Sequence, residues 1–139
     1  MAAFNKFNSF VQNLANGQFN LGSDALKILL SNTAPVASNT VKANITEIAA
    51  GNGYVAGGVQ AAFVSGNDTA GQYKLILSPV AWTASGGNIG PFEYAVLYDA
   101  TNASGDLIGW WDYGLAITLT NGNTFTVALD QVNGVLTLQ

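Results

Sequence analysis

The chain has 139 residues, of which 49% are hydrophobic and only 9% charged, with a net charge of −4 and neither His nor Cys. This composition predicts one folded domain over residues 1–139 and excludes a disordered chain, which requires low hydrophobicity and high net charge. Four Lys and no Arg argue against nucleic acid or an anionic membrane as a partner, and the absence of Cys removes disulfides and thiolate metal sites.

The N-terminal residues 1–17 carry apolar side chains three or four positions apart, at Phe4, Phe7, Phe10, Val11 and Leu14. This spacing predicts a short helical arm that ends near Asn16-Gly17. Its three Phe side chains can pack on the sheet of the same chain or dock into a neighbouring subunit. The sequence favours the first use without excluding the second.

From Ser23 onward, short runs of β-branched, aromatic and Leu residues alternate with Gly and Asn, a pattern typical of strands and turns. A helical turn is also expected within residues 41–48. The predicted strands cover residues 25–31, 59–65, 72–77, 80–83, 92–99, 107–113, 116–120, 124–130 and 135–138. These short strands, with no long helix between them, predict an all-β fold: a jelly-roll-like β-sandwich of about eight strands with a short N-terminal helix.

Asn121-Gly122 lies between two segments of alternating apolar and polar residues. Asn-Gly in that setting is the strongest short signal for a β-hairpin, so residues 116–120 and 124–130 are predicted to pair with each other. The alternation also predicts that Ile117, Leu119 and Val127 point into the core.

Residues for catalysis are scarce. Without His or Cys there is no Ser–His or Cys–His pair, and none of Lys6, Lys27, Lys42 and Lys74 lies in a motif such as S-x-x-K. No pair of carboxylates stands out among Glu47, Glu93, Asp99, Asp112 and the others, and no glycine-rich nucleotide motif occurs. The chain is therefore expected not to be an enzyme and to use no cofactor.

The segment 99–106 places oxygen-bearing side chains at Asp99, Thr101, Asn102, Ser104 and Asp106, which resembles a calcium-binding loop only weakly. It lacks the Glu that closes such a loop, because Trp110 stands at that position. A polar turn between two strands, with no metal, is the interpretation that we prefer.

Trp110 and Trp111 are neighbours in a predicted strand, so their indoles point to opposite faces. One can fill the core, whereas the outward one needs a cover. A loop of the same chain, a neighbouring subunit or a stacked sugar ring can each provide that cover.

Several segments in unbroken order, from the N-terminus to about Val127, resemble a family of small virion proteins of tailed bacteriophages. These segments are Phe4-Asn-Lys-Phe7, Asn20-Leu-Gly-Ser-Asp24, Asn32-Thr-Ala-Pro-Val36, Ile45-Thr-Glu-Ile-Ala-Ala-Gly-Asn-Gly-Tyr54, Trp82-Thr-Ala-Ser-Gly-Gly87, Gly90-Pro-Phe92 with Tyr94-Ala-Val-Leu-Tyr98, and Leu107-Ile-Gly-Trp-Trp-Asp-Tyr-Gly114. The size and the predicted sandwich are similar to the jelly-roll decoration (cement) proteins on the outside of capsids.

This resemblance implies a capsid decoration protein, made in the cytoplasm of the host bacterium, that binds the outer capsid surface as a homo-oligomer and stabilises the shell. Its partners are then the major capsid protein and other copies of itself, as a dimer or trimer. We expect contacts through Phe4, Phe7, Phe10 and Trp110 or Trp111, because large apolar side chains supply most of the buried area. The alternative is a carbohydrate-binding module of a tail or fibre, which would use stacked aromatic side chains.

Overall fold

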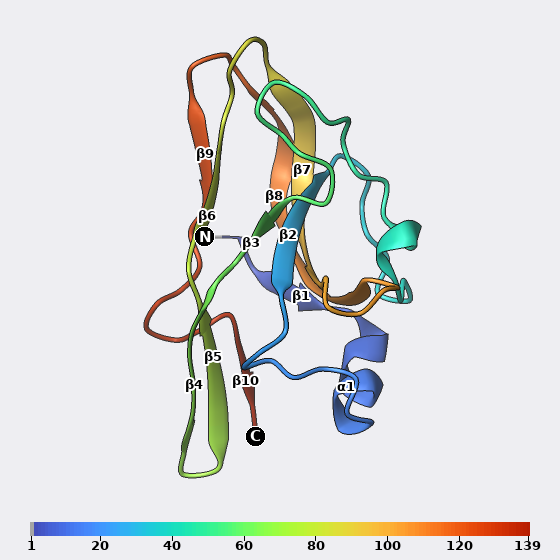
Figure 1. The fold of residues 1–139 in the computed structure, drawn as a ribbon, viewed down its shortest axis with the longest axis vertical. Helices are drawn as coiled ribbons and strands as arrows, with labels where there is room; N and C mark the ends of the chain where they lie inside the picture. Colours follow the sequence, from blue (N-terminus) through green and yellow to red (C-terminus); the bar gives the residue numbers. More distant parts are fainter. Residues whose placement is uncertain (1) are drawn as a thin grey trace.

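Antiparallel strands form the framework of the computed structural model, which describes residues 2–139 (Figure 1). Two short helices accompany them, α1 (Asn8–Ala15) and a 3-10 turn at Lys42–Asn44, and neither is long and apolar enough to cross a bilayer within the described residues. The strands are β1 (Phe4–Lys6), β2 (Leu26–Ser31), β3 (Val59–Gln60), β4 (Phe63–Thr69), β5 (Gln72–Leu77), β6 (Val80–Thr83), β7 (Ile89–Asp99), β8 (Asp106–Leu119), β9 (Thr124–Val127) and β10 (Leu136–Leu138).

The strands form two layers, as in a β-sandwich. A five-stranded sheet has the order β1-β8-β7-β2-β3, and it faces a three-stranded sheet, β10-β5-β4, and a two-stranded sheet, β6-β9. In Figure 1 the two smaller sheets stand at the left, one above the other. The predicted class, a mostly β sandwich with a short N-terminal helix, is thus confirmed.

The main core lies between these layers. Leu26, Ile28 and Leu30 of β2 point into it together with Leu75 and Leu77 of β5, and none of these five side chains is more than 1% exposed. Burying a Leu or Ile side chain stabilises a fold by about 1.5–3 kcal/mol. The core is therefore the main source of stability in a chain with so few charges.

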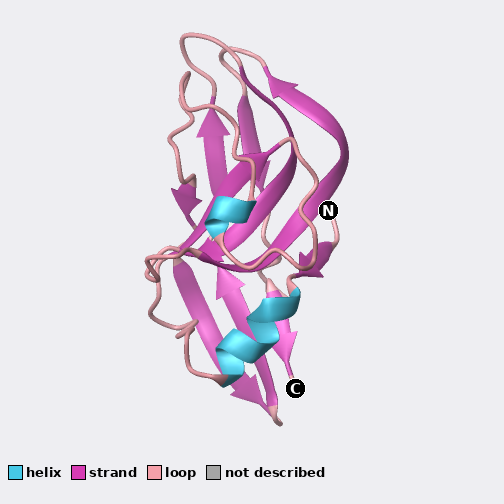
Figure 2. Cartoon of the chain, turned by 90° about the vertical axis from the view of Figure 1, so that its right-hand side faces the viewer, coloured by secondary structure: helices cyan, strands magenta, loops and turns pink. Residues whose placement is uncertain are grey.

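The outer face of the five-stranded sheet is also covered. Leu29, Val96 and Leu107 form a second cluster there beneath Phe7, with Ile45 packed against it. In Figure 2, α1 and the 3-10 turn lie on the same side of the strands. Because both faces of β2 are covered, its sequence Leu-Lys-Ile-Leu-Leu-Ser is almost continuously apolar rather than alternating.

Most predicted strands agree with the structure. The ranges 72–77 and 80–83 are reproduced, the helical turn predicted within 41–48 is present at Lys42–Asn44, and the segment 59–65 divides into β3 and β4. The ranges 107–113 and 116–120 form one strand, β8, which bulges where Gly114 has a positive φ of 81°. A residue without Cβ adopts that conformation readily, so the strand bends without ending.

The predicted hairpin at Asn121-Gly122 is wrong, although the turn is present. The Asn123 N–H donates to the Thr120 carbonyl oxygen at 3.0 Å, and Gly122 has a φ of 89°. However, β9 pairs with β6, whereas β8 pairs with β7 and β1, so the chain crosses from one sheet to another at this turn. The apolar alternation is satisfied in either pairing, because Leu119 and Val127 are buried in the same core.

The predicted helical arm over residues 1–17 is only partly helical, and residue 1 lies outside the described residues. Residues Phe4–Lys6 form β1, which pairs with β8, and the helix begins only at Asn8. It ends next to Gly17, whose N–H donates to the Leu14 carbonyl oxygen at 3.1 Å, as the Asn16-Gly17 signal predicts. Phe4 has the spacing expected of a helix, but it pairs with Trp111 of β8 at the sheet edge and is therefore extended.

Candidate functional site

The three Phe side chains predicted to contact a partner pack within their own chain. Phe7 and Phe10 are 0% and 1% exposed, and the Phe4 ring lies 5.2 Å from the ring of Trp111. The backbone N–H of Phe7 also donates to the carbonyl oxygen of Ile108 at 3.1 Å. In this conformation the Phe7 and Phe10 side chains are covered by their own chain, so contacts through them would require the N-terminal segment to detach; their role at an interface stays a prediction.

The two tryptophans lie on opposite faces of β8, as predicted. Trp111 is 4% exposed in the main core, and Trp110 is half-buried with its ring centroid 4.6 Å from that of Phe7. The cover of the outward indole therefore comes from the same chain. In this conformation Trp111 offers no free ring face to a partner or a sugar, and the predicted contact through Trp110 or Trp111 stays a prediction.

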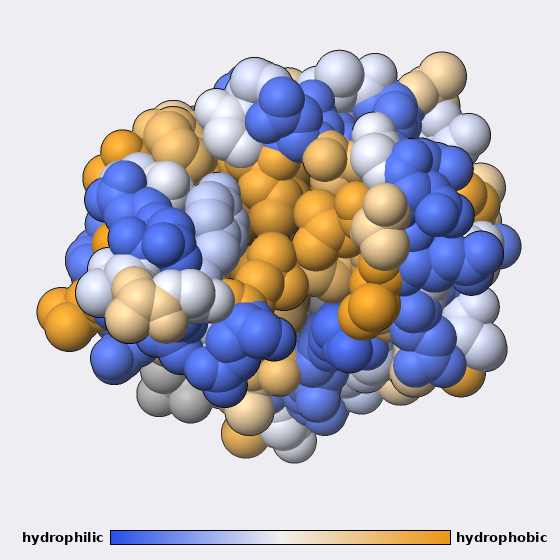
Figure 3. Space-filling model, turned by 90° about the horizontal axis from the view of Figure 1, so that it is seen from below, coloured by the Kyte–Doolittle hydropathy of each residue, from blue (hydrophilic) through white to orange (hydrophobic). Residues whose placement is uncertain are grey.

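An apolar groove that sequence reasoning missed opens at the lower end of the molecule, between α1 and the sheet β10-β5-β4. Its volume is about 540 Å³, and Figure 3 shows an apolar hollow at this end with polar residues around it. The groove, which we call the end groove, is lined by Leu14, Gly17, Phe19, Asn20, Leu21, Gly22, Phe63, Gly66, Tyr73 and Leu138.

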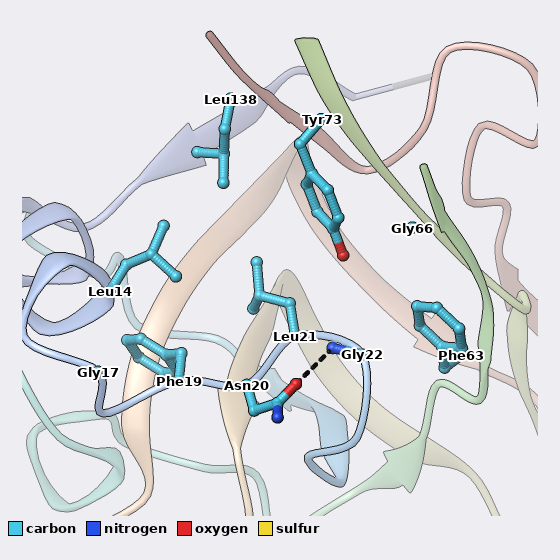
Figure 4. Close-up of a pocket in the computed structure, with 10 residues that line it drawn as sticks. All are labelled: Leu14, Gly17, Phe19, Asn20, Leu21, Gly22, Phe63, Gly66, Tyr73 and Leu138. Carbon is cyan, nitrogen blue, oxygen red and sulfur yellow. Dashed lines mark hydrogen bonds between the residues drawn. The ribbon is translucent and has the colours of Figure 1, made fainter. Parts of the chain in front are cut away.

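The end groove has one apolar wall on each layer. Phe19 and Leu21 come from the loop after α1, and Tyr73 and Leu138 come from β5 and β10 opposite them (Figure 4). An added Cβ on Gly66 would overlap the Tyr73 side chain, so the glycine gives this ring the space to lie across β4. The position of the Tyr73 ring in this wall of the groove therefore depends on the glycine at position 66.

The polar groups at the end groove are uncharged. The Tyr73 hydroxyl group points into the space in Figure 4, and burial raises the pKa of this group above its ordinary value. Asn20 uses Oδ1 to accept from the Gly22 N–H at 3.3 Å. Because no lining residue is ionic, the end groove suits an apolar, uncharged occupant better than an ion.

Sequence patterns gave little warning of this groove. Phe19 and Leu21 lie between the predicted helix and the first predicted strand, where no periodicity connects them to either element. Tyr73 and Leu138 belong to correctly predicted strands, but their proximity to that loop follows from the layer packing. The one sequence feature that could have indicated the groove is the presence of Phe19 and Leu21 within an otherwise polar loop.

The segment 99–106 is a turn between β7 and β8, as preferred above. Gly105 has a φ of 67°, and its N–H donates to the Asn102 carbonyl oxygen at 2.9 Å. Within residues 2–139, no group of three or more Asp, Glu, His or Cys side chains is placed to hold a metal ion.

Glu47 connects the long loop between β2 and β3 to the sheet. Its Oε1 accepts from the Tyr54 hydroxyl group at 2.7 Å, and that hydroxyl group accepts from the Leu30 N–H at 3.1 Å. Lys42 Nζ lies 3.4 Å from Glu47 Oε2. Burial, followed by the proximity of Glu47, raises the pKa of Tyr54 above its ordinary value, and the neutral phenol keeps both hydrogen bonds. We infer a structural role: through these two hydrogen bonds the Tyr54 hydroxyl group connects Glu47 of the loop to the backbone of β2, and we call this arrangement the Tyr54 clamp.

Comparisons with protein-family models, curated proteins and solved structures find no match to this chain. The resemblance to phage virion proteins therefore stays a prediction from the sequence.

Proposed function

We propose that this chain is a capsid decoration protein of a tailed bacteriophage, which binds the outer surface of the shell as a homo-oligomer and stabilises it. The observation that carries the proposal is the uncharged end groove. We assign to it an apolar, uncharged segment of the major capsid protein. The sequence resemblance supplies the biological setting, and the groove supplies a surface on which such a contact is favourable.

One lining residue of the end groove is itself well exposed: Phe63 on β4 is 44% exposed. Val64 on β4 and Val11 on α1, which do not line the groove, are also exposed, at 51% and 52%. A Phe side chain carries about 200 Å² of surface, so covering the exposed part of Phe63 removes roughly 90 Å² from water and contributes about 2 kcal/mol. A few such contacts suffice for a stable protein interface, because most binding energy comes from a few apolar anchors.

The test is co-sedimentation of the purified protein with shells of the major capsid protein from the same phage genome. Phe63→Ala should weaken binding by about tenfold or more, because truncating an anchor costs over about 1.4 kcal/mol. Val36→Ala is the matched control: Val36 is 58% exposed but does not line the groove, so its binding should match that of the unmodified chain.

Two results would contradict the proposal, and one control is needed. If the unmodified protein does not sediment with the shells, capsid decoration is refuted. If it binds and both variants bind equally well, the end groove is not the contact surface. Thermal unfolding of both variants must match that of the unmodified protein, so that any loss of binding reflects the surface and not the fold.

A further inference from the structure

Strand β4 is a long, open edge of the smaller layer. It ends the sheet β10-β5-β4 and has seven residues, whereas within residues 2–139 no other strand at the end of a sheet has more than four. None of its residues is buried, and in Figure 1 the β4–β5 hairpin extends to the lower end of the molecule. An open edge of this length offers unpaired backbone groups to another strand.

The hairpin turn determines which backbone groups of β4 face outward. Ala70 and Gly71 have positive φ values of 54° and 84° and form a two-residue turn, so Thr69 beside it is hydrogen-bonded to β5. Because bonded and non-bonded pairs alternate along an antiparallel ladder, the N–H and C=O groups of Gly66 and Asp68 point away from β5. No backbone hydrogen bond from elsewhere in the described residues reaches them.

The features that usually protect an edge strand from pairing are scarce in β4. Such features include Lys, Pro and bulges. Residues 65–69 contain neither Lys nor Pro, and the bulge of β4 lies before them, between Phe63 and Ser65. Strand β8 also extends beyond its partner β1, but it bulges at Gly114, so its free part is irregular. Strand β4 is therefore the better edge for pairing.

Charge favours a second copy of this chain as the source of the pairing strand. Each copy has a net charge of −4, so two copies repel unless they meet at a surface with few charges. Residues 48–67 contain no charged residue, and Asp68 is the one charged residue of β4. Two identical antiparallel strands related by a twofold axis also match each free N–H with a free C=O.

We propose that the chain forms a homodimer in which β4 pairs antiparallel with β4 of a second copy, so that the two β10-β5-β4 sheets become one continuous sheet. The inference rests on the homo-oligomer part of the proposed function and names the surface between the copies. Capsid binding through the end groove is a separate contact.

The Asp68 carboxylates favour one register of this pairing. With Gly66 opposite Gly66 of the second copy, the two Asp68 residues are four positions apart, roughly 13 Å, which exceeds the Debye length of about 8 Å. Registers centred on Asn67 or Asp68 would bring the carboxylates to within about 8 Å of each other, which is unfavourable. In the favoured register Ser65 is opposite Asn67 of the second copy, and this pair occurs twice.

The average mass of the full chain as a function of concentration tests the dimer. One pair of strands buries less than about 1,200 Å², the size of transient complexes, so we expect a reversible dimer with a dissociation constant in the micromolar range or weaker. In sedimentation equilibrium the mass should rise from the monomer value of 14.4 kDa toward twice that value as the concentration approaches about 1 mM. A mass that stays at the monomer value, or that exceeds the dimer value, overturns the inference.

Two double variants test the pairing and its register. Ser65 and Asn67 alternate with Gly66, which lines the end groove, so both lie on the other face of the sheet. Ser65→Asp with Asn67→Asp places like charges opposite each other twice and should weaken dimerisation by about tenfold or more. Ser65→Lys with Asn67→Asp places opposite charges there and should leave the dimer at least as strong as that of the unmodified chain.

Val36→Asp with Leu115→Asp is the matched control, because it adds the same charge at positions outside β4 that are 58% and 66% exposed. This control should weaken dimerisation far less than Ser65→Asp with Asn67→Asp. Equal weakening by these two acidic variants, or equal weakening by the two β4 variants, overturns the inference. Thermal unfolding of all three variants must match that of the unmodified chain.

If a β4 variant does not fold, amide hydrogen exchange of the unmodified chain decides. Protection of the Gly66 and Asp68 N–H groups should rise several-fold from dilute to concentrated solution, whereas that of the Thr69 N–H, already bonded to β5, should change less. Unchanged protection of Gly66 and Asp68 overturns the inference.

The dimer is measured without a capsid, so the two proposals can fail separately. A chain that stays monomeric in solution but sediments with the shells refutes the β4 dimer and leaves capsid binding intact. A dimer that does not sediment with the shells supports the β4 pairing and refutes capsid decoration.

Discussion

Replacing Phe7 by Ala tests whether the N-terminal segment is part of the fold or a detachable arm. The Phe7 side chain is fully buried, and its ring packs 4.6 Å from that of Trp110. Phe→Ala substitutions at such sites cost about 3–5 kcal/mol through lost transfer energy and the cavity that remains. The backbone hydrogen bond to Ile108 is unaffected by the substitution, so the cost comes from packing.

That cost is a large part of the total stability, which is of order 10 kcal/mol for a chain of this size. Urea unfolding followed by tryptophan fluorescence should therefore show a strongly reduced midpoint, and the melting temperature should fall by roughly 10–20 °C. Val11→Ala is the control in the same segment. Val11 is 52% exposed, and surface substitutions usually change stability by less than about 0.5 kcal/mol.

The two variants give a clear decision. If Phe7→Ala unfolds within about 1 kcal/mol of Val11→Ala, Phe7 is not a core residue in solution. The segment would then be free to reach a neighbouring subunit, and the interface role first predicted for its Phe side chains would regain support.

Three further predictions concern backbone geometry, the Tyr54 clamp and metal binding. Gly58→Ala should lower the free energy of unfolding by about 3 kcal/mol or more, because Gly58 has a φ of 74° and an added Cβ would overlap a β2 carbonyl oxygen. Gly71→Ala is the control: Gly71 has a φ of 84° but open space around it, so the same urea assay should show a loss of only about 1–2 kcal/mol. Tyr54→Phe should cost about 1–3 kcal/mol by leaving buried partners unpaired, whereas Tyr113→Phe should be nearly neutral; equal costs would contradict a clamp at Tyr54. Millimolar calcium should leave the melting temperature unchanged, since a bound ion would raise it; an increase would identify a site in the turn 99–106 or elsewhere.

The outcome at Asn121-Gly122 illustrates how far local patterns reach. A turn depends on a few neighbouring residues, and Gly122 supplies the positive φ that this one requires. Strand pairing depends on which sheet covers which apolar face, and the alternation around Leu119 and Val127 fits two different partners. The turn was therefore predictable, whereas the pairing of β9 with β6 was not.

The end groove illustrates the same limit for the candidate site. Tyr73 and Leu138 could be assigned to strands, but no local pattern brings them opposite Phe19 and Leu21. The start of β2 shows the same limit, because Leu26 lies far from Asp99 along the chain and becomes its neighbour only when β2 pairs with β7.

The sequence alone was sufficient to predict the features that depend on composition or on neighbouring residues. These are the period-two alternation, the glycine turns, the all-β class and the small number of ionic groups. Long-range contacts decided the rest, including the edge pairing of β1 with β8, the burial of Phe7 and Trp111, and the opening between α1 and β10-β5-β4. Propensities act over a few residues, whereas these features depend on which apolar faces of distant segments exclude water together.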